Sequence, residues 1–197
     1  MDIDKRLIEG DIELREEGGK RTVTGYAAVF NSFSKDLGGW REVIKKGAFT
    51  EALASGGEVR AFFNHEPNML LGSTVAGTVR LTENQRGLKY EIDLPDTSYA
   101  RDLAELINRK DVRGSSFAFQ ATDEDWRENG RLREVRSVIL HDVSIVTNPA
   151  YEAAQVVSMR SMESHKAEVE KAKAQHDHLE LEIYLMKQKG FTPKFLT

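Results

Sequence analysis

The chain of 197 residues contains no cysteine and no long apolar run. Without cysteine it has no disulfide framework and no thiolate chemistry, which suits a reducing compartment. No segment reaches the ~18 unbroken apolar residues of a membrane-spanning helix, and the charged first six residues do not resemble a secretion signal. We therefore expect a soluble intracellular protein without a membrane partner.

The chain also has no excess of positive charge. The formal net charge is -4, and no run of lysine and arginine is interrupted by aromatic residues. This argues against nucleic-acid binding, which needs a basic surface. With 40% hydrophobic residues over this length, the chain can bury one good core, so we expect one domain plus an appendage.

Alternating apolar residues and turn signals predict mostly strands. Hairpins are expected at residues 77–94 and around the Asn129-Gly130 turn, whose second arm covers residues 133–146. Further strands are predicted at residues 21–30, 59–64 and 111–120, and helices at residues 47–53 and 99–109. The fold class is thus mainly β with helices (α+β). Counting gives about six or seven strands and two short helices in antiparallel hairpins, which predicts a small barrel or a tightly curled sheet.

The composition changes after Ser158, and an apolar stripe with a seven-residue repeat begins. Its members are Val169, Ala172, His176, Leu179, Ile183 and Met186. This pattern predicts a C-terminal helix over residues 163–189, so we divide the chain into a domain at 1–160 and a helical tail at 161–197. A stripe this short fits a helix lying on its own barrel as well as one that binds a partner or another copy.

Two adjacent serines follow Gly114 in the strand predicted at residues 111–120. Alternation places Ser115 on the face that carries Phe117 and Phe119, and Ser116 on the opposite face. A serine hydroxyl alone is a poor nucleophile, so a catalytic role requires a base and an orienting group elsewhere in the chain.

His65 and Asp142 are candidates for these two groups. A solitary histidine such as His65 is more often structural than catalytic. His-Glu-x-x-His zinc chemistry is excluded there, because position 69 is methionine. Asp142 lies in an apolar arm and needs a polar partner, and a salt bridge to an arginine at 131, 133 or 136 competes with a catalytic role. By alternation, His141 lies on the opposite face and could orient the base instead.

The sequence argues against two other kinds of site. His176-Asp177-His178 has no third metal ligand, and the chain has no Gly-x-Ser-x-Gly nucleophile elbow, which argues against an α/β-hydrolase acting on small esters.

Several short motifs occur together in a fixed order. They are Thr24-Gly25-Tyr26-Ala27-Ala28-Val29-Phe30, Arg41-Glu42-Val43-Ile44 with Gly47-Ala48-Phe49, Asn64-His65-Glu66, Gly87-Leu88 with Leu94-Pro95-Asp96-Thr97, Gly114-Ser115-Ser116-Phe117-Ala118-Phe119, and Asp142-Val143-Ser144-Ile145-Val146 with Pro149-Ala150-Tyr151. The set resembles the prohead (capsid maturation) serine proteases of tailed bacteriophages, a family related in fold to herpesvirus assemblin. The resemblance runs from about residue 5 to residue 160 and implies a small closed antiparallel β-barrel surrounded by short helices.

The resemblance also implies a catalytic histidine, serine and third orienting residue. His65 matches the family histidine, Ser116 the serine before phenylalanine, and Asp142 the acidic position before Val-Ser. Ser115 stays open as an alternative nucleophile, because the family more often has methionine there. His141 stays open as the third residue, because the herpesvirus relatives use a second histidine.

By the same resemblance, the oxyanion is held near Ala150 and Tyr151, and no cofactor or metal is needed. The expected function is an endopeptidase that cleaves scaffold or capsid-protein segments, and itself, inside the prohead in the host cytoplasm. The expected partners are the major capsid protein or its scaffold segment and a second copy of the chain. The alternative is a catalytically inert scaffold or assembly chaperone that acts through the C-terminal helix.

Overall fold

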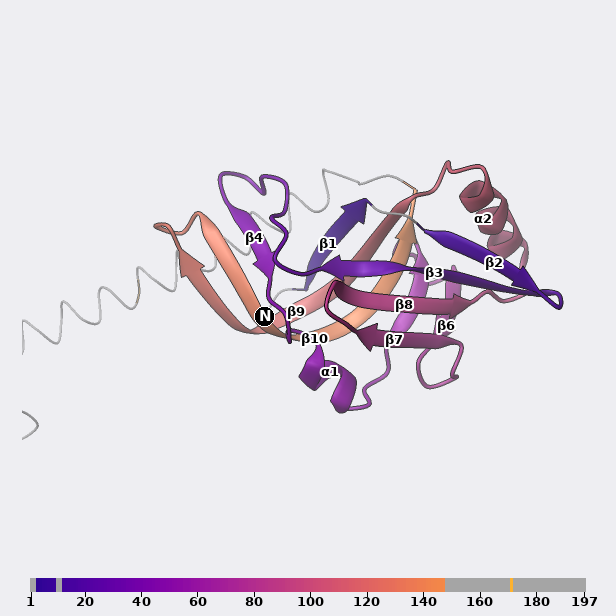
Figure 1. Ribbon diagram of the computed structural model, residues 1–197, viewed down its shortest axis with the longest axis horizontal. Coiled ribbons are helices and arrows are strands. Elements are labelled where there is room, and N and C mark those ends of the chain that lie inside the picture. Colours follow the sequence, from indigo (N-terminus) through magenta and orange to yellow (C-terminus); the bar gives the residue numbers. More distant parts are fainter. Residues whose placement is uncertain (1–2, 10–11, 148–170, 172–197) are drawn as a thin grey trace, which may run out of the picture. The chain divides into compact units, whose positions relative to one another are not determined.

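The structure is a computed structural model that describes residues 3–9, 12–147 and Lys171 (Figure 1). In chain order its elements are β1 (Asp4–Glu9), β2 (Glu13–Glu17), β3 (Lys20–Val29), β4 (Arg41–Ile44), α1 (Thr50–Ala54), β5 (Arg60–Phe63), β6 (Leu70–Ser73), β7 (Val79–Glu83), β8 (Gly87–Asp93), α2 (Ser98–Asn108), β9 (Gly114–Arg127) and β10 (Leu132–Val146). No helix in the described part of the chain is long and apolar enough to cross a membrane.

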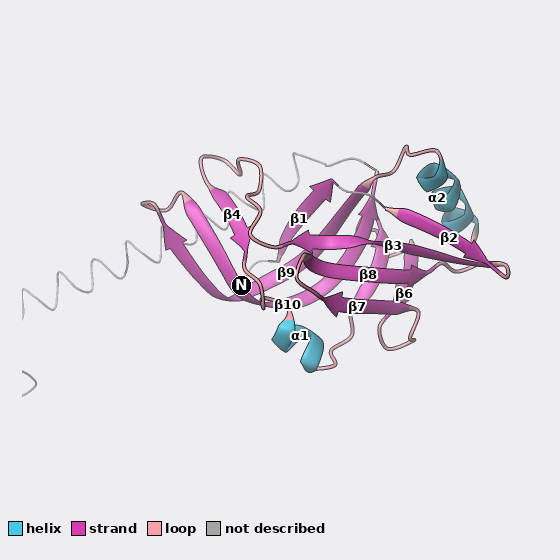
Figure 2. Ribbon diagram, in the orientation of Figure 1, coloured by secondary structure: helices cyan, strands magenta, loops and turns pink. Residues whose placement is uncertain are grey.

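The strands form two sheets (Figure 2). The larger has the order β1-β9-β10-β5-β6, with β4 also paired to β10, and the smaller has the order β2-β3-β8-β7. The predicted hairpins are confirmed: β7 pairs with β8 and β9 with β10, both antiparallel. The long strand β10 is divided between two parallel neighbours, β4 along its first residues and β5 near its end.

The prediction of a closed antiparallel barrel surrounded by helices is wrong. Within the described residues neither sheet closes, because the terminal strands β1 and β6, and likewise β2 and β7, do not pair with one another. Only two helices accompany the strands in this part of the chain, and two of the strand pairings are parallel. Hairpin signals predict that two strands adjacent in the sequence pair with each other. They do not predict whether the first and last strands of a sheet pair to close it.

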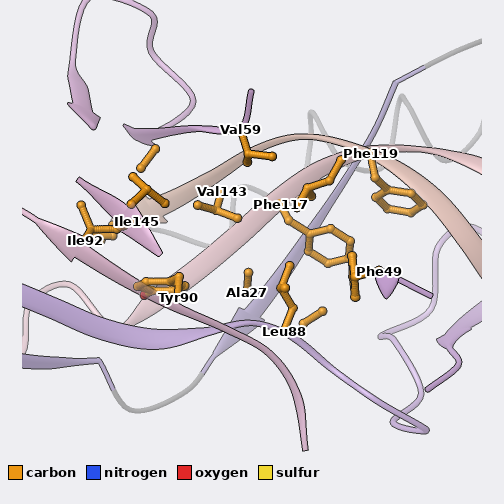
Figure 3. Close-up of a cluster of buried hydrophobic side chains, with 14 of the residues drawn as sticks. Ala27, Phe49, Val59, Leu88, Tyr90, Ile92, Phe117, Phe119, Val143 and Ile145 are labelled. Atoms are coloured by element: carbon orange, nitrogen blue, oxygen red, sulfur yellow. The ribbon is translucent and has the colours of Figure 1, made fainter. Parts of the chain in front are cut away.

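The two sheets share one hydrophobic core, part of which is drawn in Figure 3. The smaller sheet contributes Val23, Ala27, Leu88, Tyr90 and Ile92, and the larger contributes Phe117, Phe119, Val143 and Ile145. Phe117 is the centre of an aromatic group, since its ring stacks on that of Phe119 at 4.9 Å and meets the edge of Phe49 at 5.6 Å. Burial of this apolar surface supplies the main driving force for bringing the sheets together.

A network of buried charges fixes strand β1 to the rest of the larger sheet. Arg6 forms two bonds with Glu42 of β4, at 2.7 and 2.9 Å, and Arg133 of β10 bonds to Asp4 at 2.7 Å and to Glu42 at 3.0 Å. Glu124 of β9 is a further partner of Arg133. Burial alone would lower the pKa of Arg133, but the carboxylates around it outweigh burial and raise that pKa.

The remaining prediction about the fold concerns the tail. The helix predicted at residues 163–189 lies outside the described residues, apart from Lys171, and so does the predicted boundary at residue 160. Both stay predictions.

Candidate active site

Strand β9 divides the two adjacent serines between its two faces, as alternation predicts. Ser115 points into the shared core, where its Oγ lies 2.8 Å from the hydroxyl of Tyr90. Burial raises the pKa of Tyr90 to about 12, against the opposing effect of the Ser115 bond, so this phenol stays protonated at neutral pH. Ser115 is thus part of a neutral polar pair inside the core.

Gly25 of β3 makes room for that pair. A Cβ atom at residue 25 would overlap the phenol of Tyr90, on the neighbouring strand β8. Gly25 is therefore a point of close packing between β3 and β8.

Ser116 points the other way, toward the face of the larger sheet that lies opposite the shared core. Its Oγ is 2.6 Å from Nε2 of His65. The bond joins segments 51 residues apart in the chain, and Ser116 is only 4% exposed. The histidine comes from the turn that follows β5.

The turn that carries His65 has an unusual backbone. Asn64 and His65 have φ values of 56° and 55°, in the left-handed region that non-glycine residues seldom enter. The Asn64 amide N–H donates to the carbonyl of Ile145, and its side-chain oxygen accepts from the amide N–H of Thr147 at 2.9 Å. These bonds attach the turn to the end of β10 and keep the strained conformation in place, and such strain is concentrated at functional sites.

Asp142 completes the cluster from β10. Its Oδ1 lies 2.7 Å from Nδ1 of His65, the ring nitrogen that does not face Ser116. The register of β10 against β9 shifts between Leu140 and Asp142, which is a β-bulge with His141 as the extra residue. Because a bulge interrupts alternation, Leu140 can face the core while Asp142 faces the opposite side.

The competing salt bridges for Asp142 are not formed. Arg133 belongs to the buried charge network, Arg136 pairs with Asp125 at 2.6 Å, and Arg131 donates to the carbonyl of Glu128. The carboxylate of Asp142 instead has His65 and Ser144 as its partners.

His141 lies apart from the cluster. It lines a hollow with residues of α1 and with Val59, and its Nε2 is buried without a hydrogen-bond partner among the described residues. The structure therefore brings His65, Ser116 and Asp142 together, and leaves Ser115 and His141 outside. Ala150 and Tyr151 lie outside the described residues.

Ser144 is a member of the cluster that the sequence analysis missed. Its Oγ lies 3.0 Å from Oδ1 of Asp142 and 3.1 Å from Nδ1 of His65. Its position two residues after Asp142 in a strand, and so on the same face, was the available signal.

An imidazole placed between a hydroxyl and a carboxylate can take the hydroxyl proton as that oxygen attacks a carbon centre. The carboxylate holds the ring in the tautomer whose other nitrogen accepts the proton. No group of three or more histidine, aspartate or glutamate side chains that could hold a metal occurs in residues 3–9, 12–147 and 171.

Comparisons with known proteins agree with this chemistry. Residues 10–168 match the family model described as Caudovirus prohead serine protease. The chain therefore belongs to the prohead serine protease family of tailed bacteriophages, and its function is that of a capsid maturation protease.

Among relatives, the chain is similar to the prohead protease of Enterobacteria phage HK97. The two are 31% identical over an alignment of 160 residues, and the match covers 79% of this chain and 67% of the relative. The fold of this chain is similar to that of the solved structure of the bacteriophage T4 capsid assembly protease, gp21, with a TM-score of 0.52 and 13% identity. That match covers 75% of this chain and 96% of the T4 chain, and at this identity it concerns the fold alone.

Proposed function

We propose that this protein is a serine endopeptidase in which Ser116 is the nucleophile, His65 the general base and Asp142 the orienting carboxylate. The proposal is carried by one observation, the unbroken line of hydrogen bonds from Ser116 through His65 to Asp142, at 2.6 and 2.7 Å. Three separate segments, β9, the turn after β5, and β10, contribute one residue each.

In the proposed mechanism, Oγ of Ser116 attacks the carbonyl carbon of the scissile peptide bond while its proton passes to Nε2 of His65. The tetrahedral intermediate then collapses. The C–N bond breaks, the imidazolium gives its proton to the leaving amine, and an acyl-enzyme remains. A water molecule, deprotonated by His65, hydrolyses the ester and restores the serine. Throughout, Asp142 stays ionised and stabilises the imidazolium.

The oxyanion of the intermediate needs backbone N–H donors that are not already bonded. Around Ser116 they are scarce, because β9 lies between two strands: Leu7 of β1 and Ser144 of β10 are its register partners. On the resemblance to the family, we propose that the donors belong to the segment that includes Ala150 and Tyr151.

The proposed substrate is a scaffold or capsid-protein segment inside the prohead, in the cytoplasm of the host, together with the protease's own chain. The names of the family and of its relatives support this choice. The proposed role of residues 161–197 is to bring the enzyme to its assembly partner or to another copy.

Co-expression of the chain with the major capsid protein of the same phage tests the proposal. Intact mass spectrometry should show truncated capsid protein with the wild type and with Ser115→Ala, but only full-length protein with Ser116→Ala. The Ser115→Ala variant is the matched control, since it removes the neighbouring hydroxyl on the opposite face of the same strand. Truncation that persists in Ser116→Ala would show that Ser116 is not the nucleophile, and full-length capsid protein with every variant, the wild type included, would favour an inert assembly factor.

A further inference from the structure

Ser144 occupies a place in the cluster that the three-residue mechanism does not use. Ser144 is the register partner of Ser116 in the pairing of β10 with β9. On its other side, in the pairing of β10 with β5, it is the partner of Phe62, which precedes His65 by three residues. The side chain is buried, with 1% of the residue exposed. The hydrogen-bond partners that the structure describes for its Oγ are Asp142 and His65.

The hydrogens available at these three groups determine which bonds can form. An ionised carboxylate only accepts, and a hydroxyl has a single hydrogen to donate. For Nε2 of His65 to accept from Ser116, the ring hydrogen must be on Nδ1, where it is donated to Asp142 at 2.7 Å. Nδ1 then has no lone pair for Ser144, so the Ser144 hydroxyl must donate to Oδ1 of Asp142, at 3.0 Å.

Oδ1 of Asp142 therefore accepts two hydrogens, one from His65 and one from Ser144. The contact between Ser144 Oγ and Nδ1, at 3.1 Å, places the serine oxygen on the side of the ring hydrogen, where it is a weaker second acceptor. A carboxylate fixed by two donors cannot rotate away from the imidazole without losing a charge-assisted bond.

We propose that Ser144 is a positioning residue of the proposed protease: its hydroxyl holds the Asp142 carboxylate in the orientation that keeps the Nδ1 hydrogen of His65 in place. The inference rests on the proposed function, because it concerns the reactivity of Ser116. Ser144 contacts no reacting atom and acts through Asp142 and His65.

Labelling of the full chain with a fluorophosphonate probe tests this role without knowledge of the natural substrate. In this reaction Oγ of Ser116 displaces fluoride from phosphorus, and the hydroxyl proton passes to His65. Ser144→Ala should lower the maximal labelling rate about 10-fold, equivalent to about 1.4 kcal/mol of activation free energy, with the half-saturating probe concentration unchanged. It should also accelerate exchange of the His65 Nδ1 hydrogen with water in the NMR spectrum of histidine-labelled protein.

Ser115→Ala is the matched control, because it removes a second buried serine hydroxyl from the paired strand β9. It leaves the Tyr90 hydroxyl without its partner and so lowers stability, yet it should label at the wild-type rate with an unchanged His65 signal. Thermal unfolding of all variants separates loss of folded protein from loss of reactivity.

A maximal rate for Ser144→Ala within about twofold of wild type, or a loss matched by Ser115→Ala, would overturn the inference. Ser116→Ala distinguishes this failure from failure of the proposed function. If Ser116→Ala abolishes labelling while Ser144→Ala does not slow it, only the role of Ser144 is lost. If Ser116→Ala still labels at the wild-type rate, the proposed nucleophile is wrong and the role of Ser144 is overturned with it.

Discussion

Replacing Arg6 by methionine tests how strongly the buried charge network holds strand β1. Arg6 is 6% exposed and Glu42 is 2% exposed, and the two share bonds of 2.7 and 2.9 Å. In Arg6→Met the carboxylate of Glu42 stays buried, and of its two arginine partners only the bond to Arg133 is kept. Removal of one partner from a buried ion pair costs about 3–5 kcal/mol, because the other charge is left undercompensated.

The expected readout is the midpoint of thermal unfolding, followed by circular dichroism. For a domain of roughly 150 residues, each 1 kcal/mol shifts the midpoint by about 2–4 °C, so Arg6→Met should lower it by roughly 6–20 °C. Arg15→Met is the matched control, since the Arg15 side chain is 75% exposed and its pair with Glu13 is 3.3 Å long. The control should change stability by less than about 1 kcal/mol. Equal shifts in the two variants would refute the reasoning.

The remaining predictions concern the dependence of stability on pH. Burial raises the pKa of Tyr90 to about 12, so between about pH 10 and 12 the unfolded chain loses a proton that the folded chain keeps, and stability falls as the pH rises. In urea unfolding, the free energy of unfolding of the wild type should therefore exceed that of Tyr90→Phe by less at pH 11 than at pH 7. A difference that is equal at the two pH values would contradict this prediction. The side chain of Arg80, helped by Lys20 and Thr22, holds the pKa of Asp93 well below its usual range. The ionised Asp93 carboxylate stabilises the fold above about pH 4, and this stabilisation is lost as the pH falls. Asp93→Asn should therefore be less stable than the wild type at pH 7, and the difference in free energy of unfolding should narrow near pH 2. A gap that does not narrow in acid would contradict this account.

Local sequence patterns predicted the elements that depend on near neighbours. The hairpin of β7 and β8 has alternating apolar residues and a clear turn, and α2 begins and ends within a residue of its prediction at 99–109. Alternation alone predicted the two faces of β9, with Ser115 on one face and Ser116 on the other.

Long-range pairing was not predictable in the same way. Strands β1, β2, β4 and β6 were not predicted, and β1 and β6 are edges of the larger sheet. Strand β1 has two buried charged residues, Asp4 and Arg6. From the sequence alone, charged residues such as these are expected on the surface. Their burial depends on Glu42 and Arg133, which lie 36 or more residues away.

The orientation of Asp142 could not be predicted from the alternation of side chains along a strand. Strict alternation would put Leu140 and Asp142 on one face, whereas the bulge at His141 separates them. The left-handed turn at Asn64 and His65 is equally hidden, because only its bonds to the end of β10 keep that backbone in place. Motif resemblance pointed to the three residues, but only the fold brings Ser116 and Asp142 within 2.7 Å of the two ring nitrogens of His65.

The most direct test of the proposed active site is to find which residue carries the adduct after the wild-type chain reacts with a fluorophosphonate. Peptide mapping by mass spectrometry should locate a single adduct on Ser116, and the adduct should be absent from His65→Ala and strongly reduced in Asp142→Asn. An adduct on Ser115, or labelling of Ser116 that is indifferent to His65→Ala, would contradict the account.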